Sequence, residues 1–215
     1  MNESIHAVQT DDTAVKRKTT LFSAKSIAVT AVMVALMIGS QFVLSVFVGV
    51  EIVTLVLCVF CVAFGVLHGV VAAVAFALLR CLVFGFSPQV VVLYLVYYPL
   101  FAVAVGFYGR LINSSLASGV ERNEENRLNR TKTLKGVAIF AGLLLIVCAL
   151  TCSFTMLDNV ITPLILGFGK NSRLIYFYNS LPAMTTQIIC VAVSVALLFY
   201  PLWKIMYRAK ESMRL

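Results

Sequence analysis

Arg80 is the one charged side chain that lies well inside an apolar run of the sequence, the run from Val70 to Phe86. A guanidinium is costly in the interior of a membrane, so its presence there indicates a functional site by default. Its planar set of donors suits a carboxylate or phosphate on a ligand. Two other roles stay open: an ion pair with Glu51 or Asp158, and extension of the side chain to the outer headgroups.

Further polar and aromatic groups gather around the ends of the later apolar runs. Together with Arg80, the candidate substrate-binding residues are Tyr94, Tyr98, Asp158, Asn159, Asn179 and Gln187. Apolar and aromatic walls that carry a few directed polar groups are what a small-molecule pocket requires. An aromatic belt at the membrane surface explains some of the tyrosines equally well. It explains Gln187 less well, because this residue lies one turn into an apolar run.

Four small residues recur within the first apolar run and form a ladder: Ala28, Ala31, Ala35 and Gly39. The steps of four residues from Ala31 to Gly39 place these residues on one face of a helix. Small side chains let two membrane helices approach closely, because packing contacts replace the hydrophobic drive that is missing in lipid. From spacing alone, a contact with another subunit and a contact inside this chain are equally good interpretations.

The sequence lacks the patterns that membrane enzymes need. Cys58-x-x-Cys61 has the spacing of a redox or metal motif, but it lies in an apolar run without His or carboxylate neighbours, which favours simple packing. His6 and His68 are too few and too far apart to bind a metal. No phosphate loop of the form G-x-x-x-x-G-K-[ST] occurs, so the chain does not hydrolyse nucleotide itself. We therefore expect no catalysis, no metal and no cofactor.

The composition indicates that the candidate residues described above are carried by membrane helices. Hydrophobic residues make up 61% of the 215 residues and charged residues only 12%, whereas soluble domains hold about 45–50% and about 25%. A helix needs about 20 residues to cross the hydrocarbon core. Six apolar runs approach that length: Ile27–Val48, Ile52–Leu67, Val70–Phe86, Val90–Leu111, Gly136–Met156 and Pro182–Ile205. The sequence thus predicts an all-α integral membrane protein with six transmembrane helices; four helices with re-entrant hairpins are the alternative.

The basic residues set the orientation of these helices. Of the 17 Lys and Arg, all but Arg80, Lys170 and Arg173 lie in the N-terminal arm, the segment 110–135 or the C-terminal end. Basic loops stay in the cytoplasm, so both termini are expected there. The net charge of +8 then indicates contact with anionic membrane lipids and not nucleic-acid binding.

The predicted organisation has three parts. Residues 1–24 form a cytoplasmic arm, residues 25–207 a six-helix membrane domain, and residues 208–215 a cytoplasmic tail. Within the membrane domain, the segment 113–135 is predicted as a cytoplasmic loop and the segment 157–181 as an outer loop. The outer segment is hydrophobic for a loop, so it is expected to cover a pocket, re-enter the membrane or cap the packed helices.

Over residues 16–207 the order and spacing of these elements resemble the substrate-binding S components of energy-coupling factor (ECF) transporters, which import micronutrients into bacteria. The resemblance rests on the basic start Lys16-Arg17-Lys18, AVTAVMVALMIG at 28–39, VEIVTLVLCVFCVAFGVLHG at 50–69, LLRCLVFGFSP at 78–88, VYYPLFAVAVGFYGRL at 96–111, LDNVITPLILG at 157–167 and the helix end at Pro201. The order and spacing of all six helices carry the resemblance, more than any single motif.

The resemblance implies a function, a location and partners. S components lie in the bacterial plasma membrane and bind a vitamin or related compound from outside. They dock on a transmembrane coupling subunit that carries two ABC ATPases, and they are thought to topple in the membrane to release the cargo inward. Ala31 and Ala35 match the A-x-x-x-A docking pair, with Ala28 and Gly39 beside them. Related S components often carry an acid where Arg80 stands, and this departure suggests an anionic or acceptor-rich substrate.

Two other classes of protein stay open. One is a self-sufficient secondary transporter, although the interrupted helices in matching halves that are typical of such carriers are not visible. The other is a non-transporting membrane scaffold, for which the small-residue ladder would be the whole function. Co-purification with ATPase and coupling subunits would favour the S component, whereas ion-driven uptake by the chain alone would favour the carrier.

Overall fold

The computed structural model describes residues 23–46, 52–120 and 130–213, with side chains placed in 23–46, 52–113 and 136–212. Six helices fill these ranges: α2 (Ala24–Leu44), α3 (Val53–Phe64), α4 (Val66–Phe84), α5 (Pro88–Val120), α6 (Arg130–Ile165) and α7 (Lys170–Met213). All except α3 are long and apolar enough to cross a membrane. The prediction of an all-α, multi-pass integral membrane protein is confirmed.

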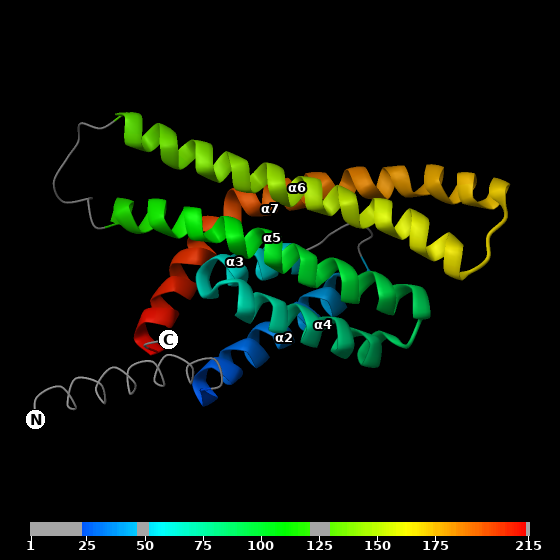
Figure 1. Cartoon of the computed structure of the whole chain (residues 1–215), viewed down its shortest axis with the longest axis horizontal. Helices are drawn as coiled ribbons and strands as arrows, with labels where there is room; N and C mark the ends of the chain where they lie inside the picture. Colours follow the sequence, from blue (N-terminus) through cyan, green and yellow to red (C-terminus); the bar gives the residue numbers. More distant parts are fainter. Residues whose placement is uncertain (1–22, 47–51, 121–129, 214–215) are drawn as a thin grey trace, which may run out of the picture.

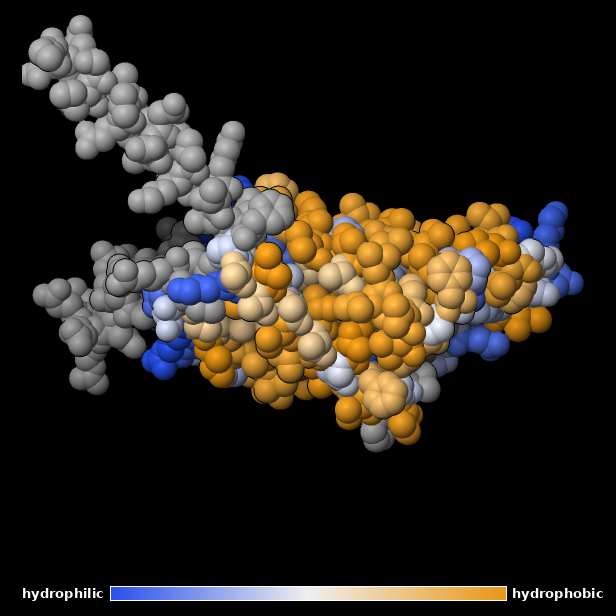
Figure 2. Space-filling model, turned by 90° about the horizontal axis from the view of Figure 1, so that it is seen from below, coloured by the Kyte–Doolittle hydropathy of each residue, from blue (hydrophilic) through white to orange (hydrophobic). Residues whose placement is uncertain are grey.

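The distribution of hydrophobic and hydrophilic residues on the surface of the helical bundle is that of a membrane-spanning protein. On the face that Figure 2 shows, hydrophobic residues form a broad band, and hydrophilic residues gather at both ends. In Figure 1 the start of α2, the end of α5, the start of α6 and the end of α7 lie at one end of the bundle. The turns between α4 and α5 and between α6 and α7 lie at the other end. This arrangement agrees with an even number of crossings, as the distribution of basic residues predicts.

α3 is the most deeply buried helix of the bundle. All of its 12 residues except Val56 are buried, because α2, α4, α5 and α7 pack against it. At 1.5 Å per residue its length is about 18 Å, which is shorter than the hydrocarbon core of a bilayer. The helix is also shorter than the run Ile52–Leu67 that predicted it, because a glycine ends it early.

The break between α3 and α4 comes at Gly65 and not at His68-Gly69, between the two predicted runs. Gly65 has φ of 91°, a backbone conformation that glycine adopts without steric cost, and its N–H donates to Cys61 O at 2.9 Å. His68 and Gly69 therefore lie within α4. The His68 Nε2 atom is 2.7 Å from Ser26 Oγ of α2, so this contact ties α4 to α2.

Other helices cap the carbonyl groups at the end of α3. Asn113 Nδ2 of α5 donates to Val62 O at 2.6 Å, and Lys210 Nζ of α7 donates to Ala63 O at 2.7 Å. Trp203 Nε1 holds Asn113 by donating to its Oδ1 atom at 3.1 Å. These contacts give partners to carbonyls near a helix end. Residues 208–213 of the predicted cytoplasmic tail continue α7, and Lys210 joins them to the core.

The segment 157–181, predicted as an outer loop, is helical except in its middle. α6 continues to Ile165 and α7 begins at Lys170, so only residues 166–169 form the turn. The prediction of a loop was wrong for most of this segment, since Pro163 lies inside α6 and Pro182 lies inside α7. Prolines are tolerated in membrane helices, because local adjustment and neighbouring helices satisfy the freed backbone groups. Figure 1 shows α6 and α7 reaching past α4 and α5 at this end.

Candidate functional site

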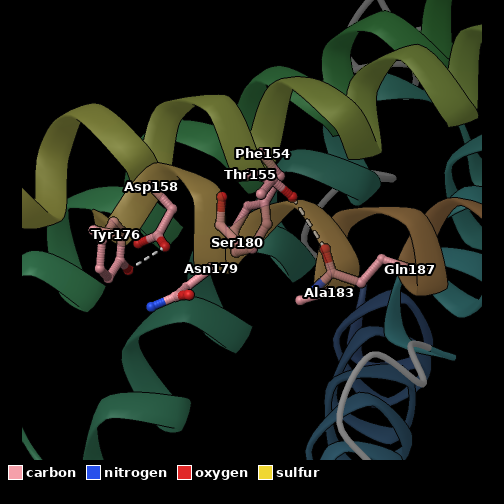
Figure 3. Close-up of a pocket in the computed structure, with 8 residues that line it drawn as sticks. All are labelled: Phe154, Thr155, Asp158, Tyr176, Asn179, Ser180, Ala183 and Gln187. Carbon is pink, nitrogen blue, oxygen red and sulfur yellow. Dashed lines mark hydrogen bonds between the residues drawn. The ribbon is translucent and has the colours of Figure 1, made fainter. Parts of the chain in front are cut away.

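A cavity of about 280 Å³ lies between α6 and α7, near the turn that joins them. Its lining consists of Phe154, Thr155 and Asp158 from α6 and Tyr176, Asn179, Ser180, Ala183 and Gln187 from α7 (Figure 3). These residues recur at helical spacing along each helix, so they share the faces that the two helices turn toward each other. The volume is close to the lower end of the range for small-molecule pockets, about 300 Å³.

Asp158 is the charged residue of this lining. Its Oδ1 atom accepts a hydrogen bond from Thr162 Oγ1 at 2.6 Å, and its Oδ2 atom accepts one from Tyr176 Oη at 2.7 Å. The two hydroxyls fix the carboxyl group but do not neutralise it. Among the side chains that the structure places, no lysine or arginine forms an ion pair with Asp158. An ionised carboxylate has lone pairs left for two further donors, so this group can accept hydrogen bonds from a ligand.

Amide groups supply the other polar contacts. Thr155 Oγ1 donates to Gln187 Oε1 at 3.1 Å, which leaves the amide nitrogen of Gln187 without a partner in the described part of the chain. Beside the cavity, Asn159 Nδ2 donates to Ser180 Oγ at 2.8 Å. The Oδ1 atom of Asn159 is buried and has no partner among the described residues. The cavity therefore combines a carboxylate, two amides and hydroxyl groups with an aromatic wall.

Tyr94 and Tyr98 of α5 lie behind the cavity and not in its lining. Both side chains are buried. The ring of Phe154, which does line the cavity, is 5.7 Å from the ring of Tyr94 and 6.3 Å from that of Tyr98, and it is 4.8 Å from Tyr97. The three tyrosines thus hold Phe154 in place, and we call them with Phe154 the aromatic wall.

Arg80 of α4 stacks on Tyr94 of this wall. Its guanidinium carbon is 4.2 Å from the ring centroid of Tyr94, and its Nε atom is buried without a hydrogen-bond partner among the described residues. Of the two predicted ion-pair partners, Asp158 binds hydroxyl groups instead, and Glu51 lies outside the described residues. Gln41 of α2 completes the group by donating to Tyr94 Oη at 3.2 Å. Arg80 therefore contacts the aromatic wall and is not among the residues that line the cavity.

The structure brings together part of the predicted substrate-binding set. Asp158, Asn179 and Gln187 line one cavity, and Asn159 contacts its wall through Ser180. Tyr94, Tyr98 and Arg80 form the layer behind. Five further lining residues were not in the predicted set: Phe154, Thr155, Tyr176, Ser180 and Ala183. Helical spacing relative to Asp158 and Gln187 was the available signal. It was hidden for Tyr176 and Ser180, which lie in the segment 157–181 that was interpreted as a loop, whereas Phe154, Thr155 and Ala183 lie in runs already predicted as helices.

The small residues of α2 face away from the bundle. Ala28, Ala31, Ala35 and Gly39 are all exposed, whereas Met33 and Met37 bury the opposite side of the helix. A Cβ atom added at Gly39 would meet no other atom within 4 Å. Of the two interpretations that spacing left open, packing inside the described chain is therefore wrong. This face is available to lipid or to another protein.

Comparisons with known proteins add no relative to this description. No protein family, curated protein or solved structure matches the chain.

Proposed function

We propose that this chain is the substrate-binding S component of an ECF-type importer in the bacterial plasma membrane. It captures a vitamin or related micronutrient from outside and docks on a transmembrane coupling subunit that two ABC ATPases drive. The observation that carries the proposal is the outward direction of Ala28, Ala31, Ala35 and Gly39 on α2. Small residues that a membrane protein leaves unpacked favour close approach by a helix of another subunit.

The position of the cavity supports the capture of a substrate. Asp158 lies seven residues before the end of α6 and Tyr176 six residues after the start of α7, which places them about 10 Å from the turn. This turn is at the end of the bundle opposite the ends of the described chain (Figure 1). The basic residues place those ends in the cytoplasm, so the cavity lies in the outer half of the membrane.

Tryptophans on the docking face test the proposal. We expect Ala31→Trp with Ala35→Trp to abolish uptake and to prevent co-purification of the coupling subunit and the ATPases. The bulk would hold the partner helix away, and substrate binding to the isolated chain would persist because α2 packs mainly against α3 and α4. Uptake in cells, pull-down of the complex and equilibrium binding measure the three effects.

The matched control places the same bulk on a different exposed face. Val193 and Leu197 of α7 are exposed to 52% and 69% and are four residues apart, like the alanine pair. Tryptophans at these two positions should leave uptake unchanged. The docking role is refuted by normal uptake in the alanine-pair variant, or by loss of substrate binding equal to its loss of uptake. Ion-driven uptake by the chain alone would identify a secondary transporter instead.

A further inference from the structure

The one charged residue that lines the cavity between α6 and α7 is the acid Asp158. This negative charge indicates which class of molecule the cavity binds. We propose that it selects a small molecule with a flat ring and a positively charged, hydrogen-bond-donating nitrogen group, which Asp158 binds directly. This inference rests on the proposed substrate-binding function and gives that function a chemical class of substrate. It differs from the anionic substrate that Arg80 suggested from the sequence.

The hydrogen bonds around Asp158 leave its charge for the ligand. Thr162 and Tyr176 each donate one hydroxyl hydrogen to it, and hydroxyl groups do not cancel a negative charge. A carboxylate removed from water without a cation costs free energy, which a cationic ligand recovers. The basic residue Arg173, on the same helix as Tyr176, is engaged elsewhere because its Nε atom donates to Phe168 O at 2.9 Å.

An anionic ligand would meet unfavourable groups at this end of the cavity. An ionised carboxylate only accepts hydrogen bonds, and the hydrogens of the two hydroxyls already point to Asp158. A carboxylate or phosphate placed there would face the like charge of Asp158, and the neutral Asn179 amide is the nearest donor in the lining (Figure 3). The guanidinium of Arg80 does not compensate from inside the cavity, because it lies against the Tyr94 ring and is not among the lining residues.

The remaining lining fits the rest of such a molecule. Phe154 and Tyr176 supply aromatic surface beside Asp158 (Figure 3), and an aromatic face attracts a cation in addition to the carboxylate. Thr155 precedes Asp158 by three residues, which is about 4.5 Å along the helix axis, and it positions Gln187. The amide nitrogen of Gln187 can therefore donate to an acceptor on the other side of a ring-sized ligand.

Two commercial probes of matched shape test the charge preference. Benzamidinium is a flat cation with four N–H donors, and benzoate is a flat anion of nearly the same size. Isothermal titration calorimetry with the full chain in lipid nanodiscs should show binding of benzamidinium in preference to benzoate. Asp158→Asn should weaken benzamidinium binding by about tenfold to a hundredfold, because a charge-assisted contact is lost. Thr162→Val, which removes one hydroxyl but keeps the carboxylate, should change it much less.

A second variant tests the location independently of the charge. Ala183 lines the cavity, so Ala183→Leu should fill it and prevent probe binding. Ala196→Leu, on an exposed part of the same helix, should bind as the unmodified chain does. The proposal is overturned if benzoate binds better, if neither probe binds, or if Asp158→Asn and Ala183→Leu leave benzamidinium binding unchanged while both variants melt normally.

The importer role is measured separately. Co-purification of the chain with a coupling subunit and ATPases does not depend on the charge of the substrate. If the complex forms but the probes contradict the charge preference, only the class of substrate is wrong. If no such complex forms, the proposed function fails, whatever the probes do.

Discussion

Three buried polar atoms have no hydrogen-bond partner in the described ranges: Gln41 Oε1, Arg80 Nε and Asn159 Oδ1. They are not scattered, because Gln41 and Arg80 both contact Tyr94 and Asn159 contacts the cavity residue Ser180. Leaving a buried polar group unpaired costs about 1–3 kcal/mol. Local departures of this kind are expected at functional sites, and here they surround the aromatic wall and the cavity.

Arg80 could either stabilise the aromatic wall or contact a ligand, and one substitution distinguishes these two roles. Its side chain stacks on Tyr94 at 4.2 Å, and a cation–π contact of this kind contributes about 0.5–2 kcal/mol. Lysine keeps the charge but loses the planar stack. We therefore expect Arg80→Lys to lower the melting temperature while the affinity for benzamidinium changes little.

The comparison that checks this prediction uses both measurements on one preparation. Asp158→Asn should show the opposite pattern, with a larger effect on affinity than on melting temperature. An Arg80→Lys variant that melts normally but binds poorly would place the guanidinium in contact with the ligand. In that case the sequence-based interpretation of Arg80 would be the correct one.

At the residue scale, the sequence identified which polar residues belong to the site better than it predicted which residues they contact. Asp158, Asn179 and Gln187 were selected for their polarity, and they do meet in one cavity. Arg80 was selected because a charge stood in an apolar run, but polarity alone does not tell whether a guanidinium faces a ligand or a tyrosine ring. That difference depends on the packing of α4 against α5, which leaves no periodic signal in the sequence.

At the scale of helices, close contact between backbones determines how α5 packs. A Cβ atom at Gly106 would lie 2.9 Å from Val66 Cα, and one at Gly109 would lie 2.8 Å from Val62 Cα. These two glycines let α5 lie directly against the junction of α3 and α4. Because the opposing atoms belong to the backbone, they cannot move aside without moving a helix.

Gly106→Ala should therefore destabilise the protein, by about 1–3 kcal/mol, because the added methyl group overpacks a tight contact. Gly39→Ala is the matched control, since its Cβ atom would meet no atom within 4 Å. In an open position of a helix, alanine is favoured over glycine by about 0.8–1.0 kcal/mol, so this variant should melt at the same temperature or higher. Thermal unfolding of the two purified variants measures both effects. Equal melting temperatures for Gly106→Ala and Gly39→Ala would contradict the close contact at Gly106.

The sequence predicted the existence of helices well and their ends poorly. Long apolar runs fix where the membrane is crossed, because no other secondary structure satisfies every backbone group within one segment. The ends depend on contacts that a linear pattern does not show. Pro163 and Pro182 both lie inside helices that extend into the segment 157–181, which was interpreted as a loop. That interpretation hid the helical spacing of Tyr176, Asn179 and Ser180, which line the cavity.

At the scale of the whole molecule, the docking face and the cavity belong to separate parts of the bundle. α2 packs mainly against α3 and α4, whereas the cavity lies between α6 and α7. The contact between Gln41 of α2 and Tyr94 of the aromatic wall connects the two parts. The proposed docking face and the cavity therefore lie on different helices, as expected if the proposed partner and substrate bind at different sites.

The orientation of the bundle gives the last prediction, because the cavity captures substrate from outside only if the α6–α7 turn faces outward. Asn171 is exposed beside this turn, and Glu125 lies in the basic segment predicted to be cytoplasmic. In a chain whose six native cysteines are replaced by alanine, Asn171→Cys should react with a membrane-impermeant maleimide on intact bacteria. Glu125→Cys should react only after permeabilisation, because basic segments are retained in the cytoplasm. The reverse labelling pattern would open the cavity to the cytoplasm, and both the importer role and its inward direction would then be refuted.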